Sequence, residues 1–306
     1  MTTKNAATGT ATGPEPRSGG PERRLHAGAI RRMVRRFRRQ RAPMVALGFL
    51  ALLVLSVVAA PLISPYDPLE QHLAAVLQGP SAEYWFGTDE LGRDLFSRVL
   101  DGGRVSLLGA VQALVVGLAI GLPLGLLAGY FSGVTDMIVM RFTDALMSFP
   151  PLVMMLAIVA ALGPNLTNAM LALGVVFAPR FIRLVRGVVL ALREEPYIEA
   201  ARSIGVAAPS IIVRHIIPNA LPPLIVQVSL ATGFAILAEA SLSFLGLGVQ
   251  PPQASWGSML SQGFSSLGQS PTMIVFPGVA IALTVLACNV VGDGLRESIG
   301  REVRSE

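Results

Sequence analysis

The chain has 306 residues, of which 52% are hydrophobic and 14% are charged, and its mean hydropathy is +0.61. Soluble domains usually carry about 25% charged residues, so this composition indicates a membrane protein. Cys288 is the single cysteine, which excludes an internal disulfide and a multi-cysteine metal site.

An arginine-rich segment occupies the N-terminus. Residues 1–41 contain Lys4 and ten arginines against Glu15 and Glu22, whereas the rest of the chain has 13 basic and 17 acidic side chains. The excess positive charge is therefore a property of this tail. A basic tail directly before a membrane span is typical of a topology signal, so we expect it to lie in the cytoplasm on anionic lipid and not to bind nucleic acid.

Six stretches of the chain are apolar enough for a membrane helix, which needs about 20 such residues. They are residues 42–66, 105–135, 137–162, 166–185, 216–237 and 272–291. Residues 67–104 then form an outer loop, 105–295 a core of five helices with a polar interval at 187–217, and 296–306 a C-terminal tail. The sequence predicts an all-α polytopic membrane protein with six transmembrane helices.

The basic residues predict the orientation of these spans. They gather in the N-terminal tail, between Arg180 and Arg214, and at the C-terminus, whereas the first long loop holds three arginines. The positive-inside rule places both termini and residues 187–215 in the cytoplasm. The loop at 67–104 is then extracytoplasmic.

The third span contains a charged start and a proline pair. Arg141 and Asp144 are three residues apart, a spacing at which they can pair on one helix face. Phe149, Pro150 and Pro151 follow. Prolines break the backbone ladder, so these residues either belong to ordinary packing or bend the helix beside a translocation path, where they become candidate path or gate residues.

The chain contains no recognisable catalytic machinery. Lys4 is its only lysine, and a phosphate-binding P-loop needs a lysine after a glycine-rich turn. The three histidines have no neighbours at metal-ligand spacing, and neither a nucleophile elbow nor a zinc-protease helix is present. We therefore expect no catalytic residue, no metal and no bound cofactor in this chain, and no enzyme activity.

The polar interval carries the most informative motif. Residues 199–218 read EAARSIGVAAPSIIVRHIIP, and Glu199, Ala200, Ala201, Gly205 and Pro218 have the spacing of the EAA loop of bacterial ABC importer permeases. A solvated linker helix is the plain alternative. Glu199 and Arg202 are three residues apart, a spacing at which they can pair on one face of a short helix.

Further segments resemble the dipeptide/oligopeptide permease family, and specifically its C-type subunit. They are FGTDELGRD at 86–94, AEASLSFLGLG at 238–248, SWG at 255–257 and GDGLR at 292–296. The resemblance covers about residues 30–300. The loop departs from the generic EAA pattern at His215 and Ile217, although RHIIPN is close to the peptide-permease version of the motif.

This resemblance implies the permease fold of a type I (MetI-like) ABC importer in the bacterial inner membrane. The implied partners are a homologous B-type permease, two ATPase subunits that bind ATP and magnesium, and an extracytoplasmic solute-binding protein. Residues 199–205, including Arg202, and Pro218 would couple to the ATPase, and the permease pair would alternate access to a path for di- or oligopeptides. Nickel and glutathione importers use similar subunits, so these cargoes stay open.

Charged residues elsewhere permit two interpretations each. Asp89, Arg93 and Asp94 form either a turn with internal salt bridges or a docking surface for the binding protein. Glu239 is the single carboxylate between residues 216 and 292, and it serves either as an internal hydrogen-bond partner or as the proton site of a secondary transporter. The arginines at 180, 183 and 186 are explained by retention at the cytoplasmic end of a span. A channel or membrane scaffold is a third class of function.

Overall fold

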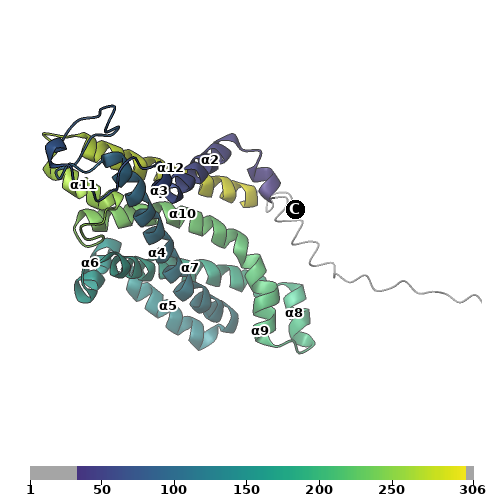
Figure 1. The fold of residues 1–306 in the computed structure, drawn as a ribbon. Coiled ribbons are helices and arrows are strands. Elements are labelled where there is room, and N and C mark those ends of the chain that lie inside the picture. The colour runs from purple at the N-terminus through teal and green to yellow at the C-terminus, as the bar shows by residue number, and fades with distance from the viewer. Residues whose placement is uncertain (1–32, 301–306) are drawn as a thin grey trace, which may run out of the picture.

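The computed structural model describes residues 33–300. These residues form helices joined by loops, with one isolated β-bridge between Thr88 and Asp94. The helices, shown in Figure 1, are α2 (Arg41–Val58), α3 (Ala60–Ile63), α4 (Leu95–Phe131), α5 (Gly133–Met147), α6 (Pro151–Leu162), α7 (Leu166–Arg193), α8 (Pro196–Ser203), α9 (Ala208–Ile211), α10 (Ile217–Phe244), α11 (Trp256–Ser265) and α12 (Thr272–Gly300). Most of the predicted basic tail, 1–41, and most of the predicted C-terminal tail, 296–306, lie outside the described residues.

Within residues 33–300, four helices are long and apolar enough to cross a membrane. They are α2, α4, the continuous helix Ala208–Phe244 and α12, and a fifth span results if the bent pair α5–α6 counts as one. Helix α7, predicted as the fourth span, has 28 residues but carries four arginines. The all-helical membrane architecture is confirmed, whereas the count of six spans is not.

The second helix begins earlier than hydropathy predicted. Helix α4 starts at Leu95, because the Asp94 side chain caps it by accepting a hydrogen bond from the Ser97 backbone N–H at 2.9 Å. The charged turn up to Arg104 is therefore helical, and the last part of the predicted 67–104 segment belongs to α4. Hydropathy detects the part of a helix that fits in lipid, whereas the cap decides where the helix starts.

Helices α4 and α7 pack against each other over most of their length (Figure 1). Glycines of α4 recur every fourth residue at this contact: Gly117, Gly121, Gly125 and Gly129. A Cβ added at Gly121 would lie 2.4 Å from the Cβ of Phe181 and 3.1 Å from the backbone oxygen of Ala178. The small residues allow close approach of the helices, which stabilises helix pairs in lipid by van der Waals contact.

The chain bends by 92° between α5 and α6. Pro151 is the first residue of α6, where its missing N–H costs nothing, and Pro150 before it has an extended ψ of 129°. Of the two interpretations of Phe149–Pro151, the structure therefore shows the bent helix. Phe149, Pro150 and Pro151 are exposed there, and a role in a path or gate stays a prediction.

Helix α5 is tied to α7 by two ion pairs. Asp144 accepts a hydrogen bond from Arg183 at 2.7 Å, and Asp136 accepts one from Arg186 at 2.7 Å. The predicted pairing of Asp144 with Arg141 is wrong. An arginine on a neighbouring helix competes for the same carboxylate, and spacing along one helix does not reveal that competitor.

The molecule has two distinct ends. The loop of residues 64–94 and α11 lie at the left of Figure 1, and α8 and α9 lie at the lower right. Helices α2 and α12 pair, and Gln40 Nε2 donates a hydrogen bond to Ser298 Oγ at 3.3 Å. The start of α2 and the end of α12 therefore lie together, toward the same side of the view as α8.

Candidate functional site

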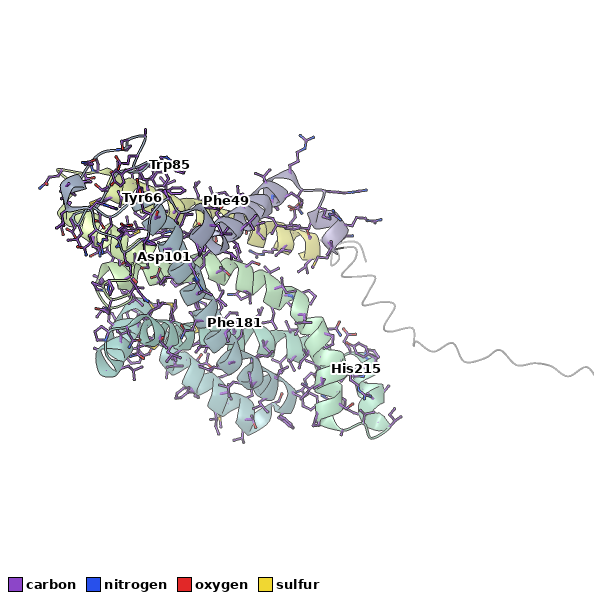
Figure 2. All side chains as sticks on the ribbon, viewed as in Figure 1. Phe49, Tyr66, Trp85, Asp101, Phe181 and His215 are labelled. Carbon is purple, nitrogen blue, oxygen red and sulfur yellow. The ribbon has the colours of Figure 1, made fainter. Side chains whose placement is uncertain are left out.

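Helix α8 is a short helix attached to the molecule by one face. Pro196 occupies its first turn, and Ile198 is fully buried in the main hydrophobic cluster. Glu199, Ala200 and Arg202 are exposed, and Ile204 just after the helix is 81% exposed. The EAA-like segment therefore presents a free surface at one end of the molecule, near the position of His215 in Figure 2.

Gly205 ends this helix by a specific backbone arrangement. Its φ is +79°, its N–H bonds to the oxygen of Arg202 at 2.9 Å, and the N–H of Val206 bonds to the oxygen of Ala201 at 3.0 Å. These two bonds define a Schellman motif, whose left-handed position favours glycine. A Cβ at Gly205 would meet nothing within 4 Å, so the requirement is conformational and not spatial.

Contacts on both sides hold α8 in place. The guanidinium of Arg202 lies 5.0 Å from the ring centroid of Tyr130 at the end of α4. The rings of Tyr197 and His215 lie 6.1 Å apart, and Asn219 Nδ2 donates to the hydroxyl of Tyr197 at 3.5 Å. Among the ion pairs of residues 33–300, the predicted Glu199–Arg202 pair does not occur, because Arg202 is directed to the aromatic ring instead.

Pro218 lies where α10 follows a π-helical turn, Ile212–Ile216. Proline has no N–H to continue an α-helical ladder, and a wider turn before it accommodates the missing bond. Ile211 and Ile216 on this segment are fully buried. The segment after α8 is thus anchored to the core and continuous with α10.

The loop before α4 is organised around one buried carboxylate. Asp89 accepts from Arg93 Nε at 2.7 Å and lies 3.3 Å from Arg98 Nε, and it also accepts from the backbone N–H groups of Leu91 and Arg93. Asp89, Arg93 and Asp94 are only 1%, 5% and 1% exposed. The internal salt bridge is confirmed. Docking of a binding protein here stays a prediction, and the burial of these side chains argues for exposed neighbours such as Glu90 as its contacts.

Arg98 is the member of this cluster that sequence reasoning missed. Its side chain is 1% exposed and donates to the backbone oxygen of Pro68 at 3.2 Å. Its position one turn after the Asp94 cap was the available signal, because a capped helix start directs that side chain back toward the loop.

Glu239 is fully buried where α10 meets α4 and α11. Ser243 Oγ donates to its Oε1 at 2.7 Å, and the hydroxyls of Ser106 and Ser255 also face the carboxylate. Its Oε2 makes no hydrogen bond with the described residues. Trp256 lies beside this site, since its backbone N–H donates to Ser106 Oγ at 3.2 Å. The internal hydrogen bond predicted for Glu239 is confirmed.

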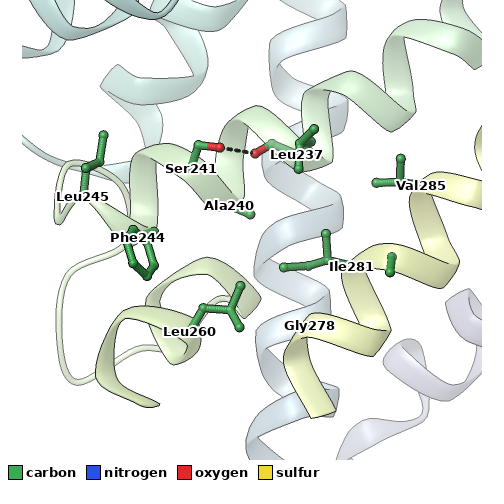
Figure 3. A pocket seen from close by; sticks show the side chains of 10 residues that line it. Leu237, Ala240, Ser241, Phe244, Leu245, Leu260, Gly278, Ile281 and Val285 are labelled. Atoms are coloured by element: carbon green, nitrogen blue, oxygen red, sulfur yellow. Dashed lines mark hydrogen bonds between the residues drawn. The ribbon is translucent and has the colours of Figure 1, made fainter. Parts of the chain in front are cut away.

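Two hollows lie along α10 and α12. Figure 3 shows an apolar one of about 610 Å³, whose walls include Phe244, Leu260 and Ile281. A smaller one of about 330 Å³ is lined by polar side chains, Arg180, Gln227 and Asn289, together with Phe234 and others. Leu237 and Val285 line both, so the hollows adjoin. Sequence reasoning missed Gln227 and Asn289, whose signal was an amide side chain inside each of two apolar spans.

The described residues combine four helices long and apolar enough to cross a bilayer with a short exposed helix at one end of the molecule. Residues 121–305 match the family of binding-protein-dependent transport system inner membrane components, and residues 29–80 match the N-terminal transmembrane domain of oligopeptide transport permease C. The chain belongs to this family and is a permease subunit of an ABC importer.

Curated relatives and solved structures agree with this assignment. The chain is 45% identical over 271 residues to the glutathione transport system permease protein GsiD of Escherichia coli O6:K15:H31 (strain 536 / UPEC), covering 88% of this chain and 89% of the relative. GsiD of Shigella boydii serotype 4 (strain Sb227) gives the same values. Inward-facing MetNI methionine ABC transporter in its native crystal form has a TM-score of 0.54 at 21% identity, covering 67% of this chain and 97% of that one, which shows the fold.

Proposed function

We propose that this chain is one half of the membrane pore of an ATP-driven peptide importer and receives its driving motion through α8. The observation that carries the proposal is the exposed face of α8 on a buried anchor, Ile198. That geometry suits a helix that docks into another protein while staying fixed to its own chain. The face formed by Glu199, Ala200, Arg202 and Ile204 would enter a groove of an ATPase subunit.

The connections of α8 support transmission of a two-state motion. It follows α7 directly and leads through the π-helical turn into α10, and these two helices contact each other. Closure of two ATPase subunits around ATP and magnesium would move α8, and rigid helices would carry that motion to the faces that line a path. ATP would be hydrolysed outside this chain, because its single lysine leaves no P-loop.

The orientation follows from charge. The end of the molecule that carries α8 also carries the start of α2 and the end of α12, and the arginine-rich tail precedes α2. By the positive-inside rule this end faces the cytoplasm, with both termini. The loop of residues 64–94 then faces outward, where a solute-binding protein would dock. A homologous B-type permease would complete the path.

The proposed cargo is a peptide. The N-terminal match to an oligopeptide permease and the relatives named for glutathione transport both support this class, since glutathione is itself a small peptide. Whether the cargo is a dipeptide, a longer peptide or glutathione is decided by uptake of each labelled compound. Nickel stays an alternative cargo, to be included in the same uptake series.

The test is co-purification in mild detergent from cells expressing the whole operon, combined with ATP-dependent uptake in proteoliposomes. Ala200→Arg places a long charged side chain on the exposed face of α8, and Ala82→Arg is the matched change on the exposed outer loop. We expect Ala200→Arg to lose the ATPase subunits while remaining folded, and Ala82→Arg to retain them. Recovery of the chain without any nucleotide-binding subunit or second permease would refute the proposal.

A further inference from the structure

Three arginines repeat along α7, but only two of them are neutralised. Arg183 and Arg186 pair with Asp144 and Asp136 of α5. Arg180 forms no ion pair with any acidic group of residues 33–300. Its guanidinium instead lies 5.2 Å from the ring centroid of Phe234 on α10, and its side chain is exposed.

The packing of α4 on α7 places Arg180 deep in the membrane region. Gly121 packs against Ala178, Phe181 and Ile182, the residues on either side of Arg180. Gly121 lies near the middle of the uncharged stretch 105–135 of the chain. Arg180 is therefore close to mid-depth, and retention at the cytoplasmic end of a span does not account for it.

A charge at this depth is costly against lipid, so such residues face a polar cavity or a partner group. The hollow of about 330 Å³ beside Arg180 is such a cavity. Gln227 of α10 and Asn289 of α12 line it and add amide donors to the guanidinium. The Phe234 ring contacts one part of the guanidinium and leaves its remaining N–H groups available to a ligand.

We propose that Arg180, with Gln227 and Asn289, forms a carboxylate-binding subsite for the cargo on the translocation path. This inference rests on the proposed transport of peptides and specifies how the cargo is recognised. A guanidinium binds a carboxylate through two parallel hydrogen bonds, and every linear peptide has a terminal carboxylate. The adjoining apolar hollow, which shares Leu237 and Val285 with this one, receives the apolar part of the peptide.

The rival explanation is that Arg180 pairs with a carboxylate of the second permease. The two explanations predict different effects of replacing Arg180 on the transport of different cargoes. A subsite loses affinity only for cargo that has a carboxylate, whereas a broken subunit contact impairs transport of any cargo. The test therefore compares alanyl-alanine with alanyl-alanine amide in the intact importer reconstituted with its binding protein.

We expect Arg180→Gln to lower Vmax/KM for alanyl-alanine by about 10- to 100-fold, the usual effect of losing a hydrogen-bonded charge, and to leave uptake of the amide unchanged. Arg180→Lys keeps the positive charge but not the two parallel N–H donors, so its Vmax/KM for alanyl-alanine should lie between the values of the unmodified chain and Arg180→Gln. Arg183→Gln, which removes an exposed ion pair on the same helix, is the control and should stay within about twofold. Equal loss of both cargoes, or no loss of either, overturns the proposal.

A second measurement omits the binding protein, which also selects its ligands. Leu237→Cys in a Cys288→Ser background places a thiol on the wall shared by both hollows. Alanyl-alanine should slow its alkylation, the amide should not, and Arg180→Gln should abolish the protection. Protection that persists in Arg180→Gln overturns the subsite. If the unmodified chain co-purifies with ATPase subunits and supports ATP-dependent uptake, a failed protection or uptake test refutes the carboxylate subsite alone. If the unmodified chain has no such partners, the transport proposal itself is refuted.

Discussion

The end of α8 provides a sharp test of how this permease is coupled to its ATPase. Gly205 has a φ of +79°, and a side chain there would have open space, with no atom within 4 Å of an added Cβ. The penalty for Gly205→Ala is therefore the cost of a left-handed L-residue alone, about 1–2 kcal/mol. That cost corresponds to about a 5- to 30-fold loss in the population of the correctly ended helix.

The fold as a whole should tolerate this change, because Gly205 is exposed and its motif is local. We expect Gly205→Ala to reduce ATP-dependent uptake several-fold while the melting temperature in detergent shifts little. Gly205→Asn should retain more uptake, since asparagine tolerates the left-handed region better than other non-glycine residues.

Gly187→Ala is the matched control. Gly187 is a helical glycine of α7 with open space around its Cβ and no positive φ. Alanine is the better helix former by about 1 kcal/mol, so this variant should be neutral or slightly more stable. The reasoning would be refuted by full uptake in Gly205→Ala, or by Gly205→Asn being as damaging as Gly205→Ala. The latter result would mean that a partner surface contacts Gly205 directly.

Three further predictions follow from buried contacts. Gly121→Val should separate α4 from α7 and lower the folded yield and the melting temperature, because even its Cβ would overlap the Cβ of Phe181. Gly187→Val is the matched control, since open space surrounds Gly187. Equal melting temperatures of the two variants would contradict the close contact between α4 and α7. Glu239→Gln should keep uptake ATP-dependent, since the amide oxygen still accepts a hydrogen bond from Ser243. Glu239→Ala removes this acceptor and should lower the free energy of unfolding by about 1–3 kcal/mol. Proton-driven uptake that needs no ATP and is lost in Glu239→Gln would instead support a secondary transporter. Asp89→Ala should destabilise the loop of residues 64–94 by about 3–5 kcal/mol, because it leaves two buried arginines unpaired, and limited proteolysis of the loop should increase. Unchanged cleavage would contradict the role of Asp89 in holding this loop.

The start of α4 shows how far local sequence information reaches. The uncharged stretch 105–135 correctly indicated a membrane helix, because the free energy of placing a segment in lipid depends on that segment's own side chains. It did not indicate Leu95 as the first residue, which depends on the cap by Asp94. The bend at Pro150 and Pro151 was predictable for the same local reason, since proline restricts its own backbone and that of its predecessor.

The charged side chains show where local information ends. Asp144 and Arg202 each had an interpretation based on spacing along one helix, and Arg180 had one based on its place at the end of a span. In the structure each contacts a residue of another helix. The sequence by itself determined the helical membrane class, the family motifs and the exposed segment at 199–205, because these depend on composition and short-range spacing. The tertiary structure alone decided the ion-pair partners, the burial of Asp89 and the depth of Arg180, because these depend on how α4, α5, α7 and α10 are placed against one another.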